Sequence, residues 1–172
     1  MPSTLRLSDL SAMHPRLLWD DIVAAATAVL AISGNQAPLR FPLEFRDVPA
    51  FGTEHTIVSI DTAGVPATNV ARLCRTYEPP RLVELAAIAV AGLAVYYGGG
   101  HEIVDVAVRG TACDYLVDTS RHSLEIAGRS RRSDSESTWQ RKWQRLAERV
   151  AGGFYLCVAE FETPSARLAF LE

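Results

Sequence analysis

Apolar residues recur at helical spacing in several segments of the chain. In the last of these segments Trp139, Trp143, Leu146 and Val150 form a narrow stripe of the kind that faces a protein core. An earlier apolar run is opened by two prolines and closed by three glycines, as helix starts and stops commonly are. The pattern predicts helices over residues 16–33, 68–75, 81–97 and 138–150.

Alternating or β-branched runs fill the stretches between these helices. They predict short strands over residues 39–45, 56–60, 101–109, 113–118, 122–127, 154–161 and 166–171, the last two antiparallel to each other. Pro42 lacks an N–H donor, which favours an edge position for its strand. The polar residues 129–137 read as a loop.

The order of these elements predicts an α+β domain with α/β-like features, in which helices flank a mixed central sheet. We expect one domain over residues 1–172. Residues 1–80 contribute a helix and short strands, and residues 81–172 contribute a core of helix, three strands, helix and strand. No internal repeat or linker divides the two parts.

Composition is that of an ordinary globular protein, with 48% hydrophobic and 22% charged residues and a net charge of −3. Three cysteines without a CxxC pair predict free, buried thiols in a reducing cytoplasm. The first residues do not predict a signal peptide. The apolar runs 22–32 and 82–97 fall short of the roughly 20 residues that span a bilayer. We therefore expect a cytoplasmic protein without a membrane segment.

Charge is unevenly distributed along the chain. Residues 121–149 hold eight basic and four acidic side chains, so this band is +4 and the remainder −7. A basic band can bind the phosphates of a nucleic acid, and its candidate contacts are Arg129, Arg131, Arg132 and Arg141. The alternative is a solvated face whose arginines pair with acids elsewhere.

Several familiar sites are excluded by spacing. The glycine run lacks the lysine and the strand–loop–helix context of a phosphate loop, so it predicts a helix C-cap. The four histidines share no helical spacing and His101-Glu102 does not extend to HExxH, which leaves no zinc motif. No GxSxG nucleophile motif is present.

Two carboxylates on neighbouring predicted strands form the remaining candidate site. Asp114 and Glu125 could together bind Mg²⁺, which takes one or two protein carboxylates and keeps waters. Glu84, in the preceding helix, could add a third carboxylate. The register of the strands decides whether Asp114 and Glu125 face the same side, and the residues equally allow ordinary polar strand positions.

The order of helix, three strands, helix and strand, with Gly110, Asp114 and Glu125 at their positions, resembles the PD-(D/E)XK nuclease superfamily over about residues 81–161. The resemblance implies a restriction-endonuclease-like fold in which Asp114 and Glu125 hold Mg²⁺. It also implies a lysine two residues after the glutamate, where this chain has Ala127. In some branches the catalytic lysine has moved to the following helix, and Lys142, the only lysine in the chain, lies on that predicted helix. Gln140 and Gln144 are weaker candidates for the polar residues of that helix.

These observations predict metal-dependent phosphodiester hydrolysis, or nucleic-acid binding, with Asp114, Glu125 and Lys142 as catalytic residues. The absence of lysine at position 127 leaves enzyme activity open. One alternative is a non-catalytic interaction module on a degenerate nuclease fold, such as a small subunit of a bacterial defence or toxin-immunity complex. Another is an antitoxin or immunity-type binding protein with an unrelated α+β fold. A protein partner or a homo-oligomer is compatible with each of them.

Overall fold

The computed structural model describes residues 3–32, 38–49, 51–108, 111–118, 122–150 and 152–172. After a 3₁₀ turn, Leu7–Asp9, the helices are α1 (Leu10–Met13), α2 (Asp20–Ile32), α3 (Ala67–Thr76), α4 (Pro79–Gly99) and α5 (Ser133–Arg149). The strands are β1 (Thr4–Arg6), β2 (Leu39–Val48), β3 (Gly52–Asp61), β4 (Ile103–Val106), β5 (Tyr115–Val117), β6 (His122–Arg129), β7 (Phe154–Glu160) and β8 (Ser165–Leu171).

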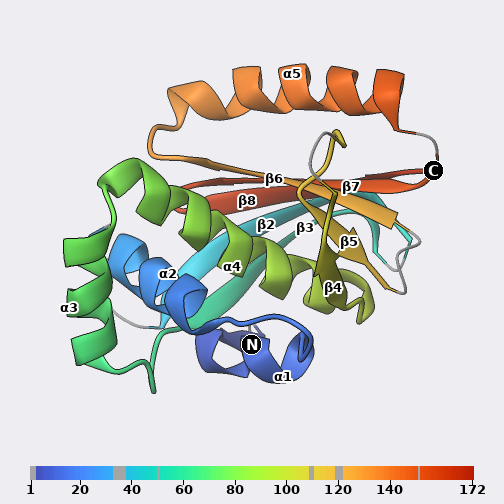
Figure 1. Cartoon of the computed structure of the whole chain (residues 1–172). Helices are drawn as coiled ribbons and strands as arrows, with labels where there is room; N and C mark the ends of the chain where they lie inside the picture. The colour runs from blue at the N-terminus through green and yellow to red at the C-terminus, as the bar shows by residue number, and fades with distance from the viewer. Residues whose placement is uncertain (1–2, 33–37, 50, 109–110, 119–121, 151) are drawn as a thin grey trace.

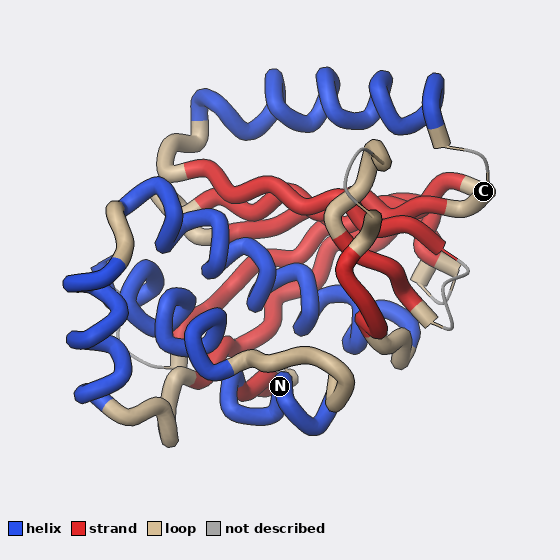
Figure 2. Tube along the Cα trace, in the orientation of Figure 1, coloured by secondary structure: helices blue, strands red, loops and turns tan. Residues whose placement is uncertain are grey.

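The described strands form one mixed sheet of eight in the order β1-β3-β2-β8-β7-β6-β5-β4. Helix α5 covers one face of this sheet, while α2 and α4 lie against the other, as Figures 1 and 2 show. The predicted α+β class with a mixed, helix-flanked sheet is therefore confirmed. Both halves of the chain contribute strands to the same sheet.

In the C-terminal half the elements follow the predicted order, α4, β4, β5, β6, α5 and β7. Strands β4, β5 and β6 are antiparallel neighbours, and β7 lies parallel to β6. Strand β8 then returns antiparallel to β7, as expected. Arg109, Gly110 and Arg121, which entered the sequence argument, lie outside the described residues.

Two boundaries differ from the prediction. Strand β6 continues to Arg129 and α5 begins at Ser133, so most of the expected loop over residues 129–137 is regular structure. Polar residues fill the first turn of α5, where Asp134 and Glu136 favour the positive end of the helix dipole. The sequence predicts a loop here because the first turn of α5 is exposed and therefore polar, as loops are.

The edge position predicted from Pro42 is wrong, because β2 lies between β3 and β8. Pairing with β8 begins only at Leu43, and Pro42 has its cross-strand partner Ile57 on β3 alone. The missing N–H of Pro42 therefore falls at the point where the ladder to β8 starts. An interior strand accommodates proline at such an end.

Helix α4 packs a long run of buried residues into the core on its side of the sheet. By length and composition it could cross a membrane, but 67% of its apolar stretch is buried inside the molecule. Its burial against the sheet and α2 accounts for its apolar composition. Gly100 adopts the left-handed conformation after the last turn, so the glycine run is the predicted C-cap.

The opposite core lies between α5 and the sheet. The predicted stripe is confirmed, with Trp139 and Leu146 buried and Trp143 packed beside them. The rings of Trp139 and Trp143 stack at 5.6 Å between centroids.

Two titratable side chains, those of His14 and Cys157, are fully buried in the core. His14 is fully buried, its Nδ1 accepts the Ile103 N–H at 3.0 Å, and its Nε2 lies 3.1 Å from the Gly92 carbonyl, to which it donates. Burial lowers the pKa of His14. Among the free cysteines, Cys157 is buried as expected, whereas Cys74 is exposed and Cys113 half-buried.

Candidate functional site

The register of β5 and β6 brings Asp114 next to Glu125. Tyr115, the first residue of β5, is paired with Leu124, so Asp114 lies just before β5 begins. Its N–H donates to the Leu124 carbonyl at 2.9 Å, and its Oδ2 accepts the Ile126 N–H at 2.8 Å. Asp114 thus extends the pairing with β6 by one residue ahead of β5, with its side chain in place of a strand carbonyl. The sequence leaves the register of these two strands open, and the structure shows that it brings the two carboxylates close together.

Glu125 is a carboxylate buried between β6 and α5. It is 3% exposed, and its Oε1 accepts hydrogen bonds from both Lys142 and Arg145. Burial raises the pKa of Glu125, Lys142 opposes that rise, and the nearby Asp114 carboxylate adds to it. The pKa of Glu125 therefore depends on the charges around it, which are the two cations that hold it and a second carboxylate close by.

The packing of α5 explains why Lys142 and Arg145 reach this carboxylate. Trp139 and Leu146 face the sheet, and residues three apart on a helix share a face. Lys142 and Arg145 therefore lie together along one margin of the apolar stripe, on the side of β6. Their side chains are 19% and 40% exposed, so both line the edge of the helix and not its outer face.

A cleft of about 500 Å³ opens beside this cluster. Beyond Leu124, β6 has β7 on one side and no strand pairing with β5 on the other. The open side of residues 126–129 forms the floor of the cleft, α4 bounds one side and α5 the other. Asp114 and Lys142 both line it, as does Ala127, the residue in place of the expected lysine. Glu125 lies beneath Lys142 and is not among the lining residues.

Gly128 sets the distance between the cleft floor and α4. A Cβ at this position would lie 2.5 Å from the Val83 carbonyl oxygen and 3.0 Å from the Ala87 side chain. Only glycine allows the two backbones this close approach. The width of the cleft therefore depends on this residue.

Glu84 also lines the cleft, from α4, but it is exposed and paired with Arg81 at 2.9 Å. Within the described residues, no group of three His, Cys, Asp or Glu side chains is placed to hold one metal ion. Asp114 and Glu125 each retain one carboxylate oxygen that accepts no hydrogen bond from the described part of the chain. Two such oxygens match the small number of protein ligands that Mg²⁺ takes.

The four candidate phosphate-binding arginines do not form one cluster. Arg129 donates to the Thr138 hydroxyl at 2.6 Å and to the Gly128 carbonyl at 2.7 Å, so it anchors α5 while lining the cleft. Arg131, Arg132 and Arg141 are exposed, and their guanidinium groups pair with none of the described residues. These three remain available for anions.

Gln140 and Gln144 point away from the cleft. Gln140 donates to Glu136 at 2.7 Å and Gln144 donates to Glu148 at 3.0 Å, both along the exposed surface of α5. The structure thus places neither of them with Asp114, Glu125 and Lys142.

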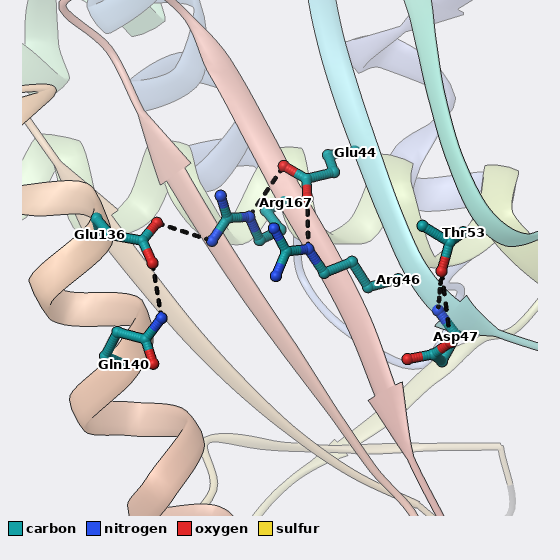
Figure 3. A network of polar contacts seen from close by, with 7 residues as sticks. All are labelled: Glu44, Arg46, Asp47, Thr53, Glu136, Gln140 and Arg167. Carbon is teal, nitrogen blue, oxygen red and sulfur yellow. Dashed lines mark hydrogen bonds and ion pairs between the residues drawn. The ribbon is translucent and has the colours of Figure 1, made fainter.

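A second polar network, drawn in Figure 3, attaches α5 to the sheet. Arg167 on β8 donates to Glu44 on β2 and to Glu136 on α5, each at 3.0 Å. Arg46 also pairs with Glu44, and the Arg167 guanidinium lies 4.7 Å from the centre of the Trp139 ring. This network fixes the half of α5 that precedes Lys142.

Sequence reasoning missed Arg145 and Arg167. Arg145 carried a usable signal, because it is three residues after Lys142 and so shares its helix face. Arg167 carried none, since its partner Glu44 is 123 residues away in the chain.

Comparison with models of protein families, with characterised protein sequences and with solved structures gives no match to this chain.

Proposed function

We propose that this protein is a metal-dependent nuclease of the PD-(D/E)XK type, acting on nucleic acid bound at the cleft between α4 and α5. The order α4, β4, β5, β6, α5 and β7 supports this, as does the parallel pairing of β6 with β7. One observation carries the proposal. Lys142 on α5 pairs with Glu125 beside Asp114, in the same cleft that Ala127 lines.

Lys142 has the role of the lysine that β6 lacks. Its side chain lines the cleft and its ammonium group pairs with Glu125, a position from which it would stabilise the negative charge that develops on a phosphate during hydrolysis. Arg145, three residues further along α5, holds the same Glu125 oxygen and helps to fix the carboxylate. The exposed Arg131, Arg132 and Arg141 would contact phosphates along the strand.

Mg²⁺ fits the available oxygens. Asp114 and Glu125 would hold it, Glu84 at the cleft margin being the candidate for a further contact, often through water. Bound there, the ion would lower the pKa of a water molecule and neutralise phosphate charge.

The test is cleavage of labelled single-stranded DNA, duplex DNA and RNA with Mg²⁺ or Mn²⁺, and with EDTA. Asp114→Asn keeps an oxygen for the Ile126 N–H and removes the charge. We expect it to lower the cleavage rate at least about 100-fold. Asp105→Asn is the matched control, since Asp105 also accepts a backbone N–H, that of Val106 at 2.8 Å, but lies outside the lining of the cleft.

A lysine relocation tests the role of Lys142. Lys142→Met should lower the rate as much as Asp114→Asn, and Ala127→Lys added to it should restore part of the rate. The control is the double variant Ala127→Met with Lys142→Met, in which the side chain at position 127 has about the size of lysine but no charge. Equal rates for the two double variants, or wild-type rates in Asp114→Asn, would contradict the proposal.

The burial of Glu125 between two cations favours a second candidate, a non-catalytic module that keeps the fold. In that case Glu125 needs no metal, because Lys142 and Arg145 already neutralise it. Nucleic-acid binding without cleavage under either metal would select this candidate.

A further inference from the structure

The cleft has an apolar side in addition to its charged one. Ile88 of α4, Val106 of β4, Tyr115 of β5 and Ile126 of β6 line it together. Ile88, Tyr115 and Ile126 belong to the core on the α4 side of the sheet, whereas Lys142 enters from α5. A ligand that fills this space therefore meets apolar surface on one side and charge on the other.

Tyr115 is the aromatic residue of this lining. Its ring is half-buried and packs against the α4-side core, which fixes its orientation. Its hydroxyl group makes no hydrogen bond with the described residues. Close by, Val106 is 59% exposed on the edge strand. A flat ligand on the Tyr115 ring would cover both side chains.

We propose that the cleft accepts one unpaired nucleotide, with its base on Tyr115 and its phosphate toward Lys142. The substrate class is then single-stranded nucleic acid. This inference rests on the proposed function for the identity of the charged side. The base faces of a duplex are already stacked on neighbouring pairs, so only an unpaired or displaced base can reach the ring. The cleft volume of about 500 Å³ lies within the range of sites that enclose small ligands.

The test measures binding without cleavage, by fluorescence anisotropy in Ca²⁺ at fixed salt. The probes are labelled 20-mers: oligo(dT), oligo(rU), a DNA duplex, and an oligo(dT) whose central bases are replaced by abasic sites. Tyr115→Leu keeps an apolar side chain and removes the ring, and Tyr115→Phe keeps the ring. Tyr96→Leu is the matched control, since Tyr96 lies on α4 but outside the cleft lining.

Base stacking on an aromatic ring contributes about 1–3 kcal/mol, equivalent to a change in affinity of about 5- to 150-fold. We expect Tyr115→Leu to weaken the preferred single strand by that factor, and Tyr115→Phe and Tyr96→Leu to stay within about threefold of wild type. Removing the bases should weaken wild-type binding by a similar factor, with little further loss in Tyr115→Leu. The single strand that binds more tightly identifies the sugar.

Equal loss on the abasic and the natural strand in Tyr115→Leu would overturn the inference, and so would wild-type affinity for the duplex equal to that for the single strands. If Tyr115→Leu does not fold, the comparison of natural and abasic strands on the wild-type protein still decides. Tyr115-dependent binding of single strands in Ca²⁺, together with no cleavage in Mg²⁺ or Mn²⁺, would support this inference and reject the nuclease. Cleavage of duplex without any Tyr115 effect would do the reverse.

Discussion

Lys142→Met should lower the free energy of unfolding by about 2 kcal/mol at neutral pH. Removing one member of an isolated buried ion pair costs about 3–5 kcal/mol, because a buried charge is left without its partner. Here Arg145 still holds Glu125, and the Lys142 side chain is 19% exposed, so roughly half of that cost is expected. For a chain of 172 residues this corresponds to a fall in Tm of about 4–8 °C.

The loss should depend on pH in a direction that the structure fixes. The pKa of Glu125 is raised above its ordinary value of 4.5, so this group favours the fold below that value and disfavours it as the pH rises through the folded pKa. Lys142 limits that unfavourable effect. Without Lys142 the pKa of Glu125 rises further, so the difference between the variant and wild type grows from near zero at about pH 4.5 to its full size at neutral pH.

Urea unfolding at pH 4.5, 6 and 7.5 measures this, with tryptophan fluorescence as the signal, since Trp139 and Trp143 lie on α5. Combining Lys142→Met with Glu125→Gln in a double-mutant cycle should give a coupling of about 1–2 kcal/mol at pH 7.5. Gln144→Met is the surface control and should change stability by less than about 0.5 kcal/mol. A destabilisation independent of pH, or a coupling near zero, would refute the reasoning.

Three other predictions concern the fold around the cleft and its core. Gly128→Ala should destabilise the protein by about 2 kcal/mol in thermal unfolding, because the added methyl group meets the Val83 carbonyl oxygen; an unchanged Tm would contradict the close approach. The lowered pKa of His14 means that its contribution to stability is complete above pH 6.5 and is lost as the pH falls through the folded pKa. In His14→Phe the free energy of unfolding should therefore fall less steeply as the pH drops below 6.5. The same pH profile as wild type would show that His14 does not cause the loss of stability at low pH. Burial raises the pKa of Cys157 to about 12, so a thiol reagent should label Cys74 in the native protein and Cys157 only after unfolding, as mass spectrometry of the peptides would show.

The sequence predicts the elements well where local periodicity is strong. Helices α2, α4 and α5 and the strands of the C-terminal half occupy the expected segments, because side-chain burial there follows the helical or strand period. The start of α5 was misplaced, since the polar turn at residues 133–137 has no apolar face to reveal it. The edge position predicted from Pro42 is wrong for a related reason. A proline indicates that one backbone hydrogen bond is missing, but it does not indicate whether a strand lies on that side further along.

The candidate site could be predicted only as a set of residues. Asp114, Glu125 and Lys142 were identified by type and position, but their proximity depends on the β5–β6 register and on the rotation of α5. Neither is a local property of the sequence. The double pairing of Glu125 also required the structure, because it follows from the burial of the carboxylate under the helix.

A lysine on α5 instead of β6 makes the geometry of the site depend on how the helix is attached to the sheet. A strand residue is held by the ladder on both sides, whereas Lys142 is held by the packing of Trp139 and by the Arg167 network. Arg167→Met should therefore slow cleavage although Arg167 is outside the cleft lining, and should weaken the Lys142–Glu125 coupling measured by the same double-mutant cycle. Arg46→Met is the control, since it removes a second arginine that contacts Glu44 and lies 5.8 Å from the centre of the Trp139 ring but leaves the Arg167–Glu136 link to α5 in place. Unchanged coupling in Arg167→Met would show that the tryptophan stripe alone positions Lys142.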